Sequence, residues 1–329
     1  MTSKIRARAT RSGLAVSEIG LGAAQLGNLG RVTSDEDVAE TVVTAWDAGI
    51  RYFDTAPHYG VGLSERRLGE TLRKCPRNEY VISTKVGRLL VPSPETARER
   101  DPEGFDVPAD PRRQWDFSRD GILRSVESSL KRTGLDRFDV LYLHDPENHF
   151  EQASTEGIST LIELRDQGVV SAVGAGMNFA APLAKLIRRA DIDLVMCAGR
   201  FSLLDGEALH ELLPLALERE VGVVAAAVYN SGLLASVRPR SDATYNYLPA
   251  PPELIERATQ VARVAEAHGV TLPELALAYV LRHPAVISVV VGARGRTQVK
   301  QNVDRYATPV PEIVWRQLDD AGLIQEFDQ

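Results

Sequence analysis

The chain has 329 residues, of which 44% are hydrophobic and 25% are charged, so it can bury one large core or two ordinary ones. Its net charge of -7 argues against nonspecific nucleic-acid binding, although a local basic patch can still hold a phosphate. No apolar run approaches the ~18 residues of a membrane span and no signal peptide is evident, so we expect a cytoplasmic protein without a membrane anchor. The two cysteines, Cys75 and Cys197, lie far apart, which favours reduced thiols over a disulfide or a metal site.

Eight short apolar runs recur along the chain, and continuous apolar runs are typical of strands buried on both faces of a parallel sheet. The first is EIGLG near residue 20. The others span residues 50–54, 80–85, 138–144, 169–176, 192–197, 221–228 and 286–292.

Segments with helical spacing of apolar residues separate these runs, and several end in glycine after a basic residue. They span residues 34–49, 64–74, 118–134, 154–168, 205–220 and 251–269. The alternation predicts an α/β fold, a (β/α)8 TIM barrel that forms a single domain over residues 1–329. An open doubly wound sheet is the alternative, but its GxGxxG phosphate loop is incomplete, because Gln25 stands at the last position after Gly20 and Gly22. Gly20, Gly22 and Gly27 favour a close backbone contact instead.

Two stretches interrupt the alternation, at residues 88–117 and 229–252, and both are rich in proline. Each follows a predicted strand, so in a barrel each lies at the C-terminal face, where active sites are built. Loops this long are typical of lids or binding loops, and disordered insertions are the alternative. Trp115 in the first stretch and the tyrosines in the second favour loops that pack.

Polar residues end three consecutive predicted strands. Asp54 ends the second strand, Lys85 the third and His144 the fourth, while Tyr59 lies in the loop just after Asp54. A phenol has an unperturbed pKa of about 10, too high for proton transfer near neutrality, but a neighbouring ammonium lowers it. Asp54, Lys85 and Tyr59 therefore predict an acid–base relay, with His144 orienting a carbonyl oxygen. The alternative is a rim salt bridge and a histidine that caps a strand.

These motifs resemble the aldo-keto reductase family over nearly the whole chain. The matching blocks are GIRYFDTAPHYG, SERRLGETL, ISTKVG, SLKRTGLDRFDVLYLHDPE and VVVGARGRTQVKQN. The resemblance implies a catalytic tetrad of Asp54, Tyr59, Lys85 and His144, and hydride transfer between a nicotinamide cofactor and a carbonyl or alcohol carbon. AGRFSLLD and YNSGLLA are similar to the branch that oxidises sugar lactols, such as L-fucose, D-threo-aldose and L-galactose dehydrogenases, and to pyridoxal 4-dehydrogenase.

The resemblance also implies a cofactor site. The residues expected to contact the cofactor are Gly22, Asp54, Asn178, Tyr229, Ser231, Leu233, Gly292, Arg294, Gln298 and Asn302. Gln298 stands where NADP-selective relatives place an arginine, so we expect NAD as the preferred cofactor, with NADP as the alternative and no metal. For the substrate, a small carbonyl compound or sugar, we expect contacts from His58, Trp115 and His149. We expect a monomer or small homo-oligomer.

Other functions remain open at this point. An aldehyde or ketone reductase would run the same chemistry in the reductive direction. A cofactor-sensing regulatory subunit would share the fold and the tetrad. A metal-dependent barrel hydrolase would use Asp54, His144 and Asp145, but the sequence offers no HxH pair or clustered ligand set.

Overall fold

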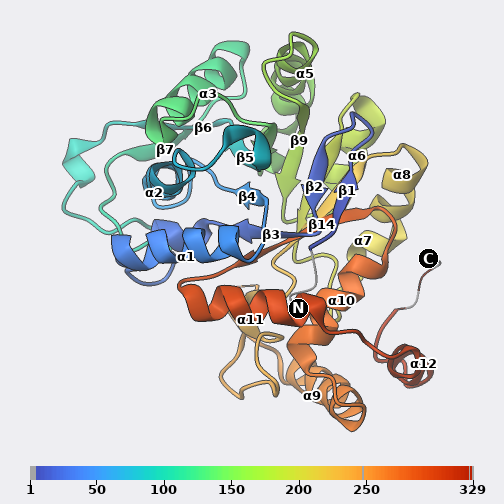
Figure 1. Ribbon diagram of the computed structural model, residues 1–329. Coiled ribbons are helices and arrows are strands. Elements are labelled where there is room, and N and C mark those ends of the chain that lie inside the picture. The colour runs from blue at the N-terminus through green and yellow to red at the C-terminus, as the bar shows by residue number, and fades with distance from the viewer. Residues whose placement is uncertain (1–4, 247, 326, 328–329) are drawn as a thin grey trace.

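The computed structural model describes residues 5–246, 248–325 and 327. Eight parallel strands form a closed barrel in the order β10-β11-β14-β3-β4-β5-β8-β9, and the pairing of β9 with β10 closes it (Figure 1). The strands are β3 (Ile19–Gly22), β4 (Tyr52–Asp54), β5 (Val81–Val86), β8 (Val140–His144), β9 (Ala172–Met177), β10 (Leu194–Ala198), β11 (Gly222–Ala226) and β14 (Val286–Gly292). The predicted (β/α)8 barrel is confirmed and the open-sheet alternative is wrong. Each predicted apolar run overlaps one strand, and β5, β9 and β10 each extend one residue beyond the predicted run.

Helices surround the barrel (Figure 1). The longer ones are α1 (Asp35–Asp47), α2 (Leu63–Leu72), α3 (Arg119–Thr133), α5 (Ile158–Asp166), α6 (Ala180–Arg189), α9 (Pro252–Ala267), α10 (Leu272–Arg282), α11 (Arg296–Ala307) and α12 (Glu312–Asp320). The shorter ones are α4 (Phe150–Gln152), α7 (Glu207–His210) and α8 (Leu212–Glu218). Ser34 and Ser118 cap α1 and α3, since each hydroxyl accepts a backbone N–H of the first turn. Helices α6, α10 and α12 were not among the predicted helices.

One predicted helix is broken. Residues 205–220 form α7 and α8 with Glu211 between them at φ -140° and ψ -48°, outside the helical region. Pro214 lies in the first turn of α8, where its missing N–H costs nothing. In one continuous helix its ring would clash with the carbonyl of His210, so the chain restarts the helix instead.

The barrel interior is filled by residues that alternate with those facing the helices. Tyr52, Val81 and Tyr142 belong to an inner cluster, whereas Phe53 and Leu141 belong to the outer core. Val16 of the N-terminal hairpin joins the inner cluster. That hairpin consists of β1 (Ala7–Ala9) and β2 (Ala15–Ser17). Arg8 donates a hydrogen bond to the carbonyl of Val286, which begins β14, so the hairpin lies at the N-terminal end of the barrel, away from the strand ends that carry Asp54, Lys85 and His144.

Each of the two long loops contains a short hairpin, and both loops lie at the C-terminal end of the barrel strands. The first pairs β6 (Arg88–Val91) with β7 (Arg112–Trp115), and β6 contacts α3. The second pairs β12 (Thr244–Tyr245) with β13 (Leu248–Pro249), and its residue 247 lies outside the described residues. The described parts of these stretches therefore follow a defined backbone path, as expected of loops that pack.

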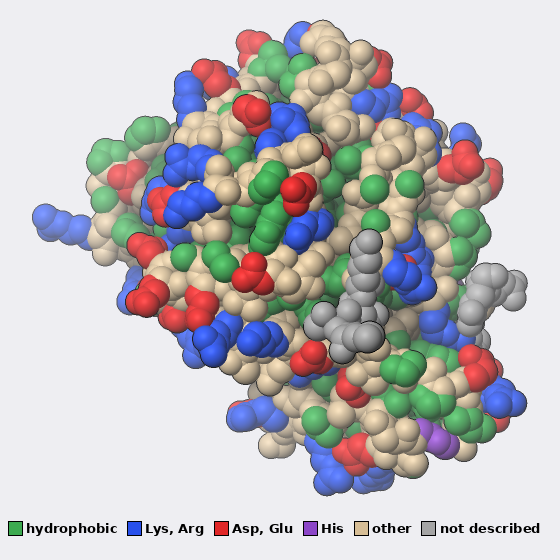
Figure 2. All heavy atoms as spheres, in the orientation of Figure 1, with side chains coloured by type: hydrophobic (Ala, Val, Ile, Leu, Met, Phe, Trp, Pro, Cys, Tyr) green, Lys and Arg blue, Asp and Glu red, His purple; other side chains and the backbone are tan. Residues whose placement is uncertain are grey.

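The visible face in Figure 2 carries acidic and basic side chains interspersed with one another. Over residues 5–246, 248–325 and 327, no helix is both long and apolar enough to cross a membrane. The same residues contain no group of three or more histidine, cysteine, aspartate or glutamate side chains placed to hold a metal ion.

Candidate active site

The alternation of the strands brings the predicted acid, lysine and histidine to the inner rim. Asp54 lies two residues after Tyr52, and His144 two residues after Tyr142, so they share the inner face of their strands. Lys85 follows Val81 by four residues and shares that face on β5. Because β4, β5 and β8 are neighbours, their C-terminal ends meet and the three side chains converge.

The ammonium group of Lys85 is saturated by three oxygen acceptors. Its Nζ lies 2.6 Å from Asp54 Oδ2, 3.0 Å from the carbonyl oxygen of Thr55 and 3.0 Å from the hydroxyl oxygen of Tyr59. Lys85 and Asp54 are each 2% exposed. A buried ammonium with three acceptors has no freedom to turn away, so Lys85 donates its third hydrogen bond to Tyr59.

A close backbone contact holds Tyr59 in place. Tyr59 lies in the loop between β4 and α2, against the 3-10 turn Ala24–Gly27. A Cβ atom on Gly27 would lie 2.6 Å from the carbonyl carbon of Tyr59 and would push the loop away. For Gly27, this contact bears out the expectation of a close approach of the backbone.

A chain of hydroxyl groups inside the barrel supports Asp54. Ser83 donates to Asp54 Oδ1 at 2.7 Å, and the hydroxyl of Tyr52 lies 3.1 Å from Ser83 Oγ and 3.2 Å from the hydroxyl of Tyr142. A carboxylate only accepts hydrogen bonds, so Ser83 must donate to it and accept from Tyr52, and Tyr52 accepts in turn from Tyr142. All donors then point toward Asp54, which stabilises its negative charge in the dry interior. Ser83, Tyr52 and Tyr142 were not predicted as site residues, because their residue types are common on strands.

Burial and charge act in opposite directions on the tyrosine. Burial raises the pKa of Tyr59, and the charge of Lys85 offsets only part of that rise. Burial by itself lowers the pKa of Lys85, but Asp54 and then Tyr59 outweigh it, so the pKa of Lys85 is raised and the group stays charged. The predicted lowering by Lys85 is therefore present as a contribution, whereas the net shift of the Tyr59 pKa is upward.

Two neutral histidines face the tyrosine. The ring centroids of His58 and His144 lie 6.0 Å from that of Tyr59 and 5.4 Å from each other. His144 is 4% exposed, and burial followed by the charge of Arg88 holds its pKa well below the usual range. His144 Nε2 lies 3.7 Å from Asp145 Oδ2, too far for a hydrogen bond, so this nitrogen remains available to a substrate oxygen.

The other predicted substrate residues, Trp115 on the long loop and His149 in the turn after β8, lie in one aromatic group. The Trp115 ring centroid lies 5.6 Å from that of His149 and 6.2 Å from that of Phe117, and Trp115 is 40% exposed. Arg88 joins this group to the histidines, since its guanidinium carbon lies 4.1 Å from the Trp115 centroid and its Nη1 lies 3.1 Å from His58 Nδ1. Arg88 was not predicted, because its role comes from side-chain contacts between loops that the sequence pattern does not place.

Part of the predicted cofactor set surrounds the rim beside Asp54. Gly22 pairs in register with both Asp54 and Gly292. Asn302 donates to the carbonyl of Gly292 at 3.3 Å and accepts from the hydroxyl of Tyr229 at 3.4 Å. These five residues therefore form one continuous edge that runs from β4 to α11.

The remaining predicted cofactor residues are spread along the same face. Gln298 Oε1 accepts the backbone N–H of Arg294 at 2.8 Å, at the start of α11. The guanidinium group of Arg294 turns back to the carbonyl of Leu29 and lies 3.3 Å from the hydroxyl oxygen of Thr33.

Three further members lie on the loops after β9 and β11. Asn178 is exposed and donates to Asp145 at 3.4 Å. Ser231 has φ +56°, in the left-handed region, and the Leu233 side chain is 1% exposed.

A buried amide in the same loop supports the presence of a polar ligand. Asn230 is 3% exposed, and among the described residues neither its Nδ2 nor its Oδ1 has a hydrogen-bond partner. A buried amide without partners is costly, and a ligand with donors and acceptors would satisfy it. The N-terminus of the 12-residue α11 adds free N–H groups that suit a phosphate. These groups fit a nicotinamide dinucleotide.

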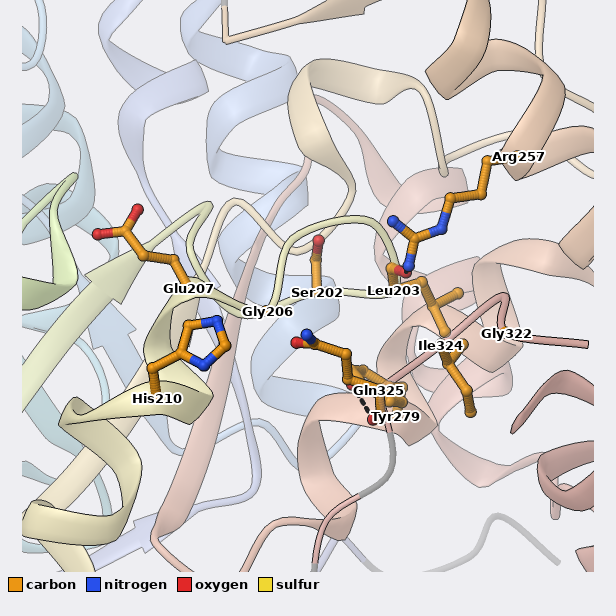
Figure 3. Close-up of a pocket in the computed structure, with 10 residues that line it drawn as sticks. All are labelled: Ser202, Leu203, Gly206, Glu207, His210, Arg257, Tyr279, Gly322, Ile324 and Gln325. Atoms are coloured by element: carbon orange, nitrogen blue, oxygen red, sulfur yellow. Dashed lines mark hydrogen bonds between the residues drawn. The ribbon is translucent and has the colours of Figure 1, made fainter. Parts of the chain in front are cut away.

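A separate cavity lies on the outside of the barrel. It has a volume of about 400 Å³, opens to solvent, and is lined by residues of α7, α9, α10 and the C-terminal segment (Figure 3). The Tyr279 hydroxyl donates to the carbonyl of Gln325 at 2.7 Å across one wall. The cavity is lined by Ser202, Leu203, Gly206, Glu207, His210, Arg257, Tyr279, Gly322, Ile324 and Gln325, so it includes none of the predicted site residues.

Comparison with known proteins agrees with this geometry. Residues 18–322 match the Aldo/keto reductase family. The chain is 46% identical over 323 residues to a D-threo-aldose 1-dehydrogenase of Pseudomonas sp, covering 96% of this chain and 97% of the relative. It is 37% identical over 332 residues to a pyridoxal 4-dehydrogenase of Microbacterium luteolum, covering 95% and 96%. Among solved structures, an aldo-keto reductase from Bacillus halodurans in its holo form is similar, with a TM-score of 0.75 and 28% identity over 98% of this chain and 97% of the other. The chain therefore belongs to the aldo/keto reductase family of NAD(P)-dependent oxidoreductases, as its motifs predicted.

Proposed function

We propose that this protein is an NAD-dependent dehydrogenase that oxidises the lactol form of an aldose to the corresponding lactone. The observation that carries the proposal is the contact at 3.0 Å between the Lys85 ammonium and the Tyr59 hydroxyl at the barrel rim, beside the neutral His144. The substrate class is supported by the similarity to the Pseudomonas D-threo-aldose 1-dehydrogenase.

In this proposal Tyr59 acts as the general base. Its phenolate, stabilised by Lys85, takes the proton of the C1 hydroxyl, while His144 holds the oxygen through a ring nitrogen. As the O–H and C1–H bonds break, a C=O bond forms at C1. Bound NAD supplies the acceptor for the hydride that leaves C1. Because burial raises the pKa of Tyr59, oxidation is favoured at alkaline pH, where more of the phenol is ionised.

The residues proposed to hold the cofactor lie on the edge described above. Gly22, Gly292 and Asn302 would contact it beside Asp54, and Asn178 and Tyr229 would line the nicotinamide end. Ser231, Leu233 and the unpartnered Asn230 amide would hold the diphosphate region, and Arg294 and Gln298 the adenosine end.

The preference for NAD over NADP is supported by the start of α11. A 2′-phosphate needs a cation, and bidentate arginine is the usual choice. Here Arg294 is engaged with the carbonyl of Leu29, Arg296 pairs with Glu40 at 3.2 Å, and Gln298 carries no charge. We also propose one barrel domain over residues 1–329, as a monomer or small homo-oligomer.

The test is a substrate panel followed through the absorbance of the reduced cofactor. D-threo-aldoses, L-galactose and pyridoxal are each offered with NAD and with NADP. We expect the highest kcat/KM with a D-threo-aldose and NAD, and a lactone as the product by mass spectrometry. A higher kcat/KM with pyridoxal, the compound named in the Microbacterium luteolum relative's description, would replace sugar lactols as the proposed substrate class. Tight cofactor binding without turnover of any aldehyde, aldose or ketone in either direction would instead favour a regulatory subunit.

A further inference from the structure

Arg88 connects three loops at the rim of the barrel. It is 8% exposed and begins β6, and its guanidinium group contacts one side chain from each loop. Nη1 lies 3.1 Å from His58 Nδ1 in the loop after β4, and Nη2 pairs with the carboxylate of Asp145 after β8. The guanidinium carbon lies 4.1 Å from the ring centroid of Trp115 on β7. A buried cation with these three contacts has one orientation available.

The contact with Arg88 determines which nitrogen of His58 carries the proton. Arginine only donates hydrogen bonds and does not lose its proton in proteins. His58 Nδ1 must therefore accept, and a neutral imidazole that accepts at Nδ1 carries its proton at Nε2. Protonation of both nitrogens would place two cations in contact. Burial, followed by the charges of Arg88, Arg113 and Lys85, lowers the pKa of His58 to about 2, so the ring stays neutral.

The Nε2–H group of His58 is left for a ligand. Among the described residues, none accepts a hydrogen bond from it. His58 is half-buried, and its ring lies against those of Tyr59, His144 and Phe105, at centroid distances of 6.0, 5.4 and 5.3 Å. The free donor is therefore next to the group that would take the substrate proton.

We propose that Arg88 is a positioning residue that fixes His58 as a neutral Nε2–H donor, and that this donor binds an oxygen acceptor of the substrate. The identity of that acceptor, a hydroxyl or ring oxygen of a lactol, rests on the proposed function. The assignment of the His58 proton to Nε2 does not rest on the proposed function. An aldose offers such oxygens beside C1, whereas a cation at this place would be repelled by Arg88, Arg113 and Lys85, whose charges all act on His58.

The proton assignment is tested by NMR of protein labelled with 15N in histidine. Long-range correlations between ring protons and nitrogens distinguish the two tautomers, and the His58 signals are assigned with His58→Gln. We expect the wild type to show an acceptor-type Nδ1 and a protonated Nε2. The double variant Arg88→Met/Asp145→Asn removes the donor without leaving an unpaired buried carboxylate, and we expect a mixture of tautomers. Asp145→Asn alone keeps Arg88 and is expected to keep the wild-type pattern.

Kinetics with the best aldose test the role of the fixed donor. We expect the double variant to raise KM about tenfold relative to Asp145→Asn, with kcat within threefold, as for the loss of one hydrogen bond. His58→Gln, whose amide N–H occupies the place of Nε2–H, is expected to retain a lower KM than His58→Leu. A wild-type His58 protonated at Nδ1, or the same tautomer pattern in the double variant, would overturn the inference even if aldoses are oxidised. If no aldose is oxidised but the tautomer is as expected, the proposed substrate class fails while the role of Arg88 in fixing His58 stands.

Discussion

At the scale of single residues, the feature that decides the chemistry is the environment of one phenol. Burial raises the pKa of Tyr59, and only the ammonium of Lys85 at 3.0 Å opposes that rise strongly. Lys85 can oppose the rise in the pKa of Tyr59 because Asp54 and the carbonyl of Thr55 keep its ammonium group charged and fixed in place.

The first prediction concerns the charge of Lys85. In the oxidative direction Tyr59 must be deprotonated, so the rate rises with pH through the pKa of Tyr59. Lys85→Met removes the cation that lowers this pKa, so the ascending limb of the rate–pH profile should move to higher pH. Lys131→Met, at an exposed lysine that pairs with Glu127, is the matched control and should keep the wild-type limb. Residual activity in Lys85→Met with an unmoved limb would show that Lys85 does not tune Tyr59.

The second prediction concerns the hydroxyl chain. Ser83→Ala leaves the buried hydroxyl of Tyr52 without its acceptor and removes one donor from Asp54. Loss of a buried partner typically costs about 1–3 kcal/mol, so the free energy of unfolding in a denaturant titration should fall by that amount.

Ser125→Ala is the matched control for Ser83→Ala. Ser125 is also buried, but among the described residues its hydroxyl has no partner, so its removal should be neutral or stabilising. Equal losses in the two variants would mean that the chain through Ser83 contributes nothing specific.

At the scale of elements, the sequence predicts strands better than it predicts the contacts of loops. Strand ends were recognised because apolar runs stop at Asp54, Lys85 and His144. The break between α7 and α8 was missed because a proline at a helix start and one inside a helix look alike in sequence. The hairpin of β6 and β7 was also missed, since β6 has only four residues and β7, with the sequence RRQW, carries little apolar signal.

The third prediction concerns the loop of residues 88–117. Arg113 holds it by donating to Asp101 at 2.9 Å and to the carbonyl of His58 at 2.7 Å. Arg113→Met leaves the Asp101 carboxylate, which is 1% exposed, without its cation, and should loosen the loop.

Limited trypsin digestion measures this effect at the exposed Arg98 and Arg100. We expect cleavage there to be several-fold faster in Arg113→Met than in the wild type. Arg112→Met removes an exposed neighbouring arginine, and thus also one trypsin site. In this variant trypsin should cleave at Arg98 and Arg100 at the wild-type rate. Equal rates in both variants would show that Arg113 does not anchor the loop.

The fourth prediction concerns the start of α11 and cofactor choice. Gln298→Arg places a cation where the proposed adenosine end lies, so kcat/KM for NADP should rise about tenfold while that for NAD changes little. Gln301→Arg, on an exposed position of the same helix, is the control for a general gain in positive charge. A wild-type preference of tenfold for NADP would overturn the proposed choice of NAD and direct attention to Arg294 and Arg296.

At the scale of the whole molecule, the barrel brings residues that are far apart in the sequence together in one site. Asp54, Lys85 and His144 are separated by 31 and 59 positions, yet adjacent parallel strands bring their ends together. This convergence could be predicted from the sequence, because it depends only on the alternation of side chains along each strand and on the order of the strands. Arg88 and Asn230 could not, because their importance comes from side-chain contacts, or the lack of them, between loops that periodicity does not place.

The account depends most directly on Tyr59 as the group that moves the proton. Tyr59→Phe keeps the ring and removes the hydroxyl, so cofactor binding, followed by fluorescence titration, should stay within threefold of the wild type. Turnover of the best aldose should fall by the ~10²–10⁴ expected when a general acid–base is lost. The deciding measurement is kcat of Tyr59→Phe against the wild type at the same saturating cofactor concentration. A fall of that size with intact cofactor binding is the predicted result, and a kcat within threefold of the wild type would contradict the account.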